Sequence, residues 1–147
     1  MEERHTAALD KVLHLSTLVA TDLARFEQES GLTAARIHLL WMLGIVGPST
    51  QQSLATALNV TPRNVTGLVD GLVASGHVKR EPHPTDRRAT LVTPTEVGRR
   101  TIVDLQDSHR DLARKLFGAV PARRLQAFVT TLDETIGTFE RLMEEGT

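Results

Sequence analysis

The chain has 147 residues, 40% of them apolar, and a formal net charge of −1. This length fits one domain, or one compact unit with an appended helical region, in an ordinary soluble protein. The absence of cysteine excludes disulfides and thiol nucleophiles. The longest nearly apolar run, residues 39–46, is too short to span a bilayer, and the charged start MEERHTAALDKV is unlike a secretory signal. We therefore expect a cytoplasmic protein without a membrane partner.

The first third of the chain predicts two helices. Apolar residues recur every three or four positions from residue 5 to about residue 28, which is typical of an amphipathic helix. Thr33 is placed to cap a second helix, and Gly47-Pro48 ends it. That second helix is apolar on most sides from Ile37 onward, so we expect it at the centre of the fold.

Two short helices follow. Residues 51–60, QQSLATALNV, predict the first helix and a turn. Thr61 is a favourable N-cap for the second, and Pro62 suits its first position because the N–H that proline lacks would have no partner there. The second helix ends at Ser75-Gly76. Its apolar stripe consists of Val65, Leu68, Val69, Leu72 and Val73. Two short helices joined by a tight turn indicate a helix-turn-helix.

A basic hairpin is expected directly after these helices. Residues 77–81 and 89–93 are typical of short strands, and the loop 82–88 between them carries two prolines and then Asp86-Arg87-Arg88. A helix followed by such a hairpin is the arrangement of a winged helix-turn-helix, which binds DNA. The expected fold class is therefore mainly α with a small β-hairpin wing.

Two long helices are expected to complete the chain. One begins at Pro94 or Thr95 and runs to about Phe117, and the other runs from Pro121 to about Glu145. The apolar stripe of the last helix is longer than the core of a small winged helix can cover. We therefore expect a single unit, 1–147, in which residues 33–98 bind DNA and residues 1–30 and 99–147 form a dimer interface.

The distribution of charge supports the DNA-binding interpretation. Residues 63–100 contain seven Lys and Arg against four Asp and Glu, a net charge of +3. The segments on either side, 1–62 and 101–147, contain four against six and six against eight, so each is −2. The local sign of the charge, rather than the total, decides whether a surface attracts phosphate.

The chain resembles the MarR family of bacterial transcriptional regulators over essentially its whole length. The wing sequence DRRATLVTPTEVG resembles the D-x-R wing of the family, and NVTPRNVTGLVDGLVASGHVKRE resembles its recognition helix and the following strand. The resemblance implies a homodimer on a pseudo-palindromic DNA operator, with each recognition helix in a major groove and each wing in a minor groove. It also implies that Arg88 contacts the minor groove and that Asp86 orients it through an ion pair.

Candidate DNA-binding residues lie in the two short helices and the hairpin. They are Gln51, Gln52, Ser53, Thr61, Pro62, Arg63, Asn64, Thr66, Arg80, Asp86, Arg87 and Arg88. For Gln51, Gln52 and Ser53 a simple helix cap on a solvated surface is an equal alternative. Lys79 and Arg80 alternate along a strand, so only one of them is expected to face DNA. Many family members have Thr-Arg where this chain has Thr66-Gly67, so base reading should depend more on Arg63, Asn64 and Thr66.

An effector pocket is implied by the family resemblance, and no cofactor is expected. The candidate pocket residues are His14, Leu18, His38, Trp41, Met42, Leu105 and His109, each of which could instead belong to the core. A small aromatic or phenolic effector is the expected ligand. The alternatives are a winged-helix module for protein interaction without specific DNA binding, and a metal-responsive regulator of the same fold.

Neither a metal site nor a catalytic site is expected. The six histidines show no metal-ligand spacing such as HExxH. Asp107-Ser108-His109 contains the residue types of a catalytic triad, but consecutive helical positions point about 100° apart and cannot assemble one. An enzyme is therefore not expected.

Overall fold

The computed structural model describes residues 1–146 and divides the chain into two compact units, Met1–Leu105 and Gln106–Thr147. The elements, in chain order, are α1 (Glu2–Ser30), α2 (Ala34–Val46), β1 (Ser49–Thr50), α3 (Gln51–Leu58), α4 (Pro62–Ala74), β2 (Val78–Pro82), β3 (Thr90–Pro94), α5 (Glu96–Phe117) and α6 (Ala122–Glu145). The unit boundary falls inside α5. The mainly α fold with a small β wing is confirmed. No helix within residues 1–146 is long and apolar enough to cross a membrane.

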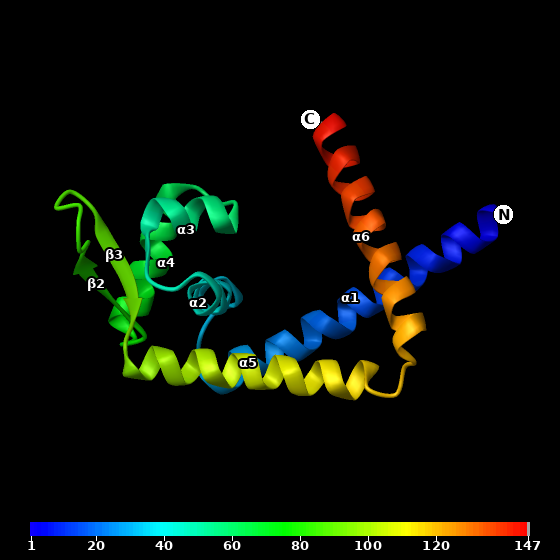
Figure 1. The fold of residues 1–147 in the computed structure, drawn as a ribbon, viewed down its shortest axis with the longest axis horizontal. Coiled ribbons are helices and arrows are strands. Elements are labelled where there is room, and N and C mark those ends of the chain that lie inside the picture. Colours follow the sequence, from blue (N-terminus) through cyan, green and yellow to red (C-terminus); the bar gives the residue numbers. More distant parts are fainter. Residues whose placement is uncertain (147) are drawn as a thin grey trace. The chain divides into compact units, whose positions relative to one another are not determined.

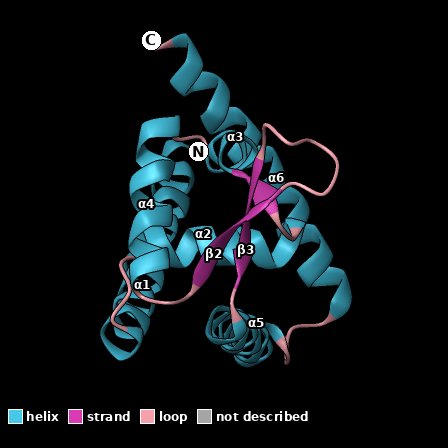
Figure 2. Ribbon diagram, turned by 90° about the vertical axis from the view of Figure 1, so that its left-hand side faces the viewer, coloured by secondary structure: helices cyan, strands magenta, loops and turns pink. Residues whose placement is uncertain are grey.

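The wing is part of a three-stranded antiparallel sheet in the order β1-β3-β2. Its two longer strands, β2 and β3, are drawn side by side in Figure 2. The long pair runs from Val78 opposite Pro94 to Pro82 opposite Thr90. The predicted hairpin had only two strands, because nothing in the dipeptide Ser49-Thr50 distinguishes a strand from the approach to a helix. Its pairing with Val92 and Leu91 comes from the tertiary fold.

The helix-turn-helix is formed by α3 and α4 (Figure 1). Thr50 caps α3 by accepting the backbone N–H of Ser53 at 3.1 Å. The turn between the helices requires Asn59 in the left-handed conformation, with φ 53°, which asparagine tolerates better than most residues. Thr61 then caps α4, with Pro62 in its first turn, as predicted.

A single apolar core holds the first unit together. Its buried side chains are Leu32, Ile37, Leu39, Leu40, Leu43, Leu54, Ala55, Val65, Val69, Leu72, Val78, Val92, Ile102 and Leu105. Four of them come from α2, which confirms the central place predicted for that helix. Within the predicted apolar stripe of α4, Val65, Val69 and Leu72 are buried, whereas Val73 is 39% exposed.

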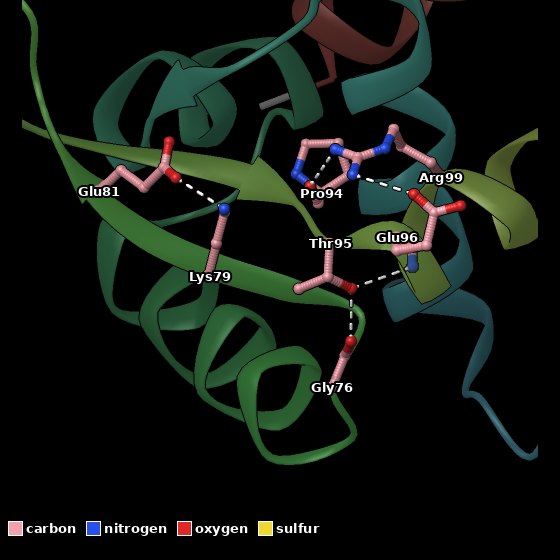
Figure 3. A network of polar contacts seen from close by, with 8 residues as sticks. Gly76, Lys79, Glu81, Pro94, Thr95, Glu96 and Arg99 are labelled. Atoms are coloured by element: carbon pink, nitrogen blue, oxygen red, sulfur yellow. Dashed lines mark hydrogen bonds and ion pairs between the residues drawn. The ribbon is translucent and has the colours of Figure 1, made fainter.

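The end of α4 is joined to the start of α5 through Thr95 (Figure 3). The Thr95 hydroxyl donates to the Gly76 carbonyl at 2.5 Å and accepts the N–H of Gly98 at 3.1 Å, while the Thr95 N–H donates to the His77 carbonyl at 3.0 Å. A Cβ at Gly98 would overlap that same carbonyl oxygen. Glycine at position 98 therefore allows the first turn of α5 to approach the chain leaving α4.

Both terminal helices carry apolar side chains that their own unit leaves uncovered. Along Glu2–Ser30 no residue is buried, although Leu9, Val12, Leu13, Leu15, Leu18, Val19 and Leu23 lie there. In the second unit, the rings of Phe117 and Phe128 lie 6.1 Å apart between centroids and hold the end of α5 against α6. No residue of Ala122–Glu145 is buried, and its exposed apolar residues are Phe128, Val129, Ile136, Phe139, Leu142 and Met143.

Candidate nucleic-acid interface

The first turn of α4 presents polar side chains to solvent because its apolar face is committed to the core. Val65 and Val69 are fully buried, so Arg63, Asn64 and Thr66 lie on the outer surface. The Thr61 hydroxyl accepts the N–H of Asn64 at 3.2 Å, which fixes the start of the helix. The N-terminal end of such a helix is the part that reaches base edges in a helix-turn-helix.

Four polar side chains connect α3, α4 and β2. The Gln51 amide donates to the Thr66 hydroxyl at 3.0 Å and accepts from Arg80 Nε at 3.0 Å. Arg80 also donates to the Asp70 carboxylate at 2.6 Å. Three of the predicted DNA-binding residues, Gln51, Thr66 and Arg80, are thus brought together, and the charge of Arg80 is balanced within the protein.

The hydroxyl of Thr66 has one remaining function toward a ligand. It donates its proton to the Pro62 carbonyl at 3.0 Å and already accepts from Gln51. Since a hydroxyl has one donor and two acceptor positions, one lone pair remains. Thr66 can therefore accept from an amino group of cytosine or adenine, or place its methyl group against thymine.

Lys79, the other cation of β2, is also paired inside the protein (Figure 3). Its ammonium lies 2.8 Å from the Glu81 carboxylate. This hydrogen bond, with the attraction of the ammonium charge, lowers the pKa of Glu81 despite a smaller opposing effect of desolvation. Both cations of β2 are therefore neutralised locally, which sequence alternation along the strand did not predict.

The wing tip differs from the arrangement that the family resemblance implied. Asp86 was expected to form an ion pair with Arg88, but its carboxylate instead accepts the backbone N–H of Arg88 at 3.0 Å. Within residues 1–146 no hydrogen bond or ion pair engages the guanidinium groups of Arg87 and Arg88, and both residues are exposed. Asp86 thus shapes the turn, and both guanidinium groups stay available to phosphate or a groove.

The three residues at the start of α3, Gln51, Gln52 and Ser53, have different roles in the structure. The Thr50 hydroxyl accepts the Ser53 N–H and donates to the Ser53 hydroxyl, so Ser53 takes part in the cap while the proton of its own hydroxyl is not used there. Gln51 belongs to the polar network with Thr66 and Arg80. Gln52 is exposed, and its side chain forms no hydrogen bond within the part of the chain that is described.

The predicted effector residues do not share one environment. Leu105 is buried in the core, and Trp41 and Met42 are half-buried against it. His14, Leu18 and His38 are exposed, as is His109 in the second unit. In residues 1–146 no three His, Asp or Glu side chains lie close enough together to hold a metal ion.

Two residues of this surface were missed by sequence reasoning. Asp70 is an acid on the outer face of α4 that pairs with Arg80 of β2, and its sequence position alone does not reveal this partner. His83 accepts two backbone N–H groups of the wing loop. Its position between Pro82 and Pro84 indicates a turn but not this use of the ring.

The helix-turn-helix α3–α4 and the β2–β3 wing together define a winged helix-turn-helix protein. A sequence model of the MarR family matches residues 32–90, from Leu32, two residues before α2, to the first residue of β3. The structure of RV1404 from Mycobacterium tuberculosis is 31% identical in sequence and superposes with a TM-score of 0.71, covering 89% of this chain and 92% of RV1404. The chain belongs to the MarR family of DNA-binding transcriptional regulators, and this confirms the resemblance read from its motifs.

Other relatives agree in class. YcgE of Bacillus subtilis, an uncharacterized HTH-type transcriptional regulator, is 33% identical over 92 residues, which span 60% of this chain and only 60% of YcgE. The transcriptional repressor IacR of Pseudomonas putida is 26% identical over 82% of this chain and 72% of its own length. FabT of Streptococcus pneumoniae, solved in complex with DNA, shares the fold with a TM-score of 0.76 at 18% identity, over 88% of this chain and 94% of FabT. YcgE and IacR are described as transcriptional regulators, in agreement with the expectation that this chain is not an enzyme.

Proposed function

We propose that this protein is a homodimeric repressor that binds a pseudo-palindromic DNA operator and is released by a small aromatic or phenolic effector. Residues 33–98 form the DNA-binding part, and residues 1–30 and 99–147 form the dimerisation part. The recognition helix α4 enters the major groove, where Arg63, Asn64 and Thr66 meet base edges. The wing enters the flanking minor groove with Arg88.

The distribution of paired and unpaired cations carries the DNA-binding part of the proposal. Lys79 and Arg80 are neutralised by Glu81 and Asp70. In the described part of the chain, the guanidinium groups of Arg63, Arg87 and Arg88 are engaged by no side chain. These three free charges lie at the start of the recognition helix and at the wing tip, the two elements with which a winged helix-turn-helix contacts DNA. Guanidinium groups favour both the phosphates and the negative potential of a narrow minor groove.

Dimerisation is supported by the uncovered apolar faces of α1 and α6. Phe139 is 60% and Leu142 61% exposed, at a spacing that places both on one face of α6. Contiguous exposed apolar surface of this kind marks an interaction site. A two-fold dimer also supplies the symmetry that a pseudo-palindromic operator requires. Repression follows by analogy with the repressor IacR.

Selection of bound fragments from genomic and random DNA tests this function. The expected product is an inverted repeat whose half-site centres are separated by about 10 bp, one helical turn. Binding to that repeat should weaken steeply with salt, because phosphate neutralisation releases counterions. Recovery of no common sequence would support the alternative, a winged-helix module for protein interaction.

Effector release requires its own experiment. A thermal-shift screen with small aromatic acids, phenols and divalent metal salts identifies ligands, and each ligand is then tested for release of the operator. An aromatic ligand that raises the unfolding temperature and lowers operator affinity supports the proposal. Release by a metal ion, abolished by a chelator, would replace the aromatic effector with the metal-responsive alternative.

A further inference from the structure

The loop between β2 and β3 closes on the ring of His83. Its Nδ1 lies 3.0 Å from the backbone nitrogen of Asp86 and 3.2 Å from that of Thr85, and both N–H groups donate to it. The Thr85 hydroxyl lies 3.3 Å from the same atom. A nitrogen that accepts two N–H groups must present its lone pair, so the ring is neutral with its proton on Nε2.

Other bonds of the loop depend on the same turn. The His83 N–H donates to the Ala89 carbonyl at 3.1 Å, and the Ala89 N–H donates to the Asp86 carbonyl at 3.1 Å. Pro82 and Pro84 flank His83 and restrict the backbone on both sides of it. The backbone hydrogen bond to Ala89 thus holds the main chain of His83 in place, and the His83 ring accepts the N–H groups of Thr85 and Asp86. The imidazole has the role that an Asn or Asp oxygen has in an Asx turn.

We propose that neutral His83 is the positioning residue of the wing, holding the loop in the form that presents Arg87 and Arg88 to DNA. This inference rests on the proposed function of the wing. His83 itself contacts no DNA in this scheme. It keeps the free loop close to the conformation that binds DNA. The loop therefore loses less conformational entropy on binding, and affinity is higher.

Two substitutions separate the proposed role from simple loss of a side chain. His83→Ala removes the acceptor, and His83→Asn supplies an amide oxygen that can accept the same backbone N–H groups without titrating. Operator affinity at pH 7.5 should fall roughly fivefold to tenfold in His83→Ala, the effect of one to two weak hydrogen bonds. His83→Asn should stay within about twofold of the wild type by the same reasoning. Equal loss in both variants would make the ring a direct contact and overturn the proposal.

Arg88→Ala distinguishes failure of this inference from failure of the proposed function. If Arg88→Ala binds the operator as well as the wild type, the wing does not take part in binding and the proposed function is wrong for this element. If Arg88→Ala binds weakly while His83→Ala binds normally, only the positioning role of His83 is wrong.

Discussion

The guanidinium of Arg80 lies 2.6 Å from the carboxylate of Asp70, and this contact ties β2 to the outer face of the recognition helix. Arg80 also donates to Gln51, which in turn bonds Thr66. These four side chains connect β2, the start of α3 and the recognition helix α4. The sequence predicted that Arg80 contacts DNA, and in the structure Arg80 forms an ion pair with Asp70.

Removal of the Asp70 charge should raise affinity for DNA and lower the preference for the operator. In Asp70→Asn the charge of Arg80 is no longer balanced, so one more cation is available to phosphate. The salt dependence should steepen by about one counterion, and non-specific binding should gain more than operator binding. Fluorescence anisotropy on operator and scrambled duplexes between 50 and 200 mM salt measures both effects.

Asp107→Asn is the matched control, because Asp107 forms a similar exposed pair with Arg110 on α5, at 2.7 Å. It makes the same change in net charge outside the proposed DNA surface. An equal rise in affinity in both variants would show that the total charge, and not the release of Arg80, is responsible. The stability of either variant should change by less than about 1 kcal/mol, since exposed ion pairs contribute little.

Arg63→Ala should weaken operator binding and also relax the preference for bases at one position of each half-site. A bidentate contact from arginine to guanine discriminates by roughly 1–3 kcal/mol, so a loss of that size should be confined to the operator. Competition binding against operators with single base changes gives the measurement. Arg124→Ala, an exposed arginine at the start of α6, is the control and should bind normally. Uniform weakening on every sequence would make Arg63 a phosphate contact.

Local sequence signals predicted the helices and the wing, and tertiary contacts decided the rest. The caps at Thr33 and Thr61 and the stop at Ser75-Gly76 lie where turn chemistry placed them, because these signals depend only on neighbouring residues. Strand β1 is two residues long and exists only through its pairing with β3. Its formation depends on residues more than 40 positions away in the sequence, which no local pattern reports.

The candidate site was predictable in outline but not in its pairings. The positive charge of residues 63–100 and the resemblance of the wing and the helix to family motifs predicted that Arg63 and Arg88 contact DNA. Whether a cation is free or balanced depends on which side chains meet across elements, as Arg80 and Asp70 do over ten positions. The same reason explains His83, because an imidazole that binds the backbone cannot be distinguished in sequence from one exposed to solvent.

Gly98→Ala should destabilise the protein although it adds one methyl group to a helix. The new Cβ would overlap the His77 carbonyl oxygen, and both groups belong to backbone that bonds through Thr95. Overpacking of this kind typically lowers the free energy of unfolding by about 1–3 kcal/mol. Gly67→Ala is the control, because nothing lies within 4 Å of its added Cβ, and it should stabilise the helix by about 0.5–1 kcal/mol. Urea unfolding monitored by circular dichroism measures both, and an unchanged midpoint for Gly98→Ala would contradict the close approach.

Phe139→Lys should convert the proposed dimer to a monomer and abolish tight operator binding. The Phe139 side chain is 60% exposed in the single chain, and burying an aromatic side chain of this size against a partner contributes about 1.5–3 kcal/mol. A lysine there would lose this contribution and place a charge in the apolar interface. A monomer also has only one DNA-binding part. Binding at one half-site then no longer raises the affinity for the other. Sedimentation velocity and operator binding on the same samples measure both consequences.

Ile45→Lys is the control for this change, because Ile45 is 62% exposed but lies at the end of α2, outside the terminal helices. It should remain dimeric and bind the operator, since the same substitution there removes no interface contact. A dimeric Phe139→Lys protein would contradict the use of α6 in dimerisation. A monomeric Ile45→Lys protein would place the interface on the DNA-binding part instead. The proposed binding of two wings to separate half-sites would then be contradicted.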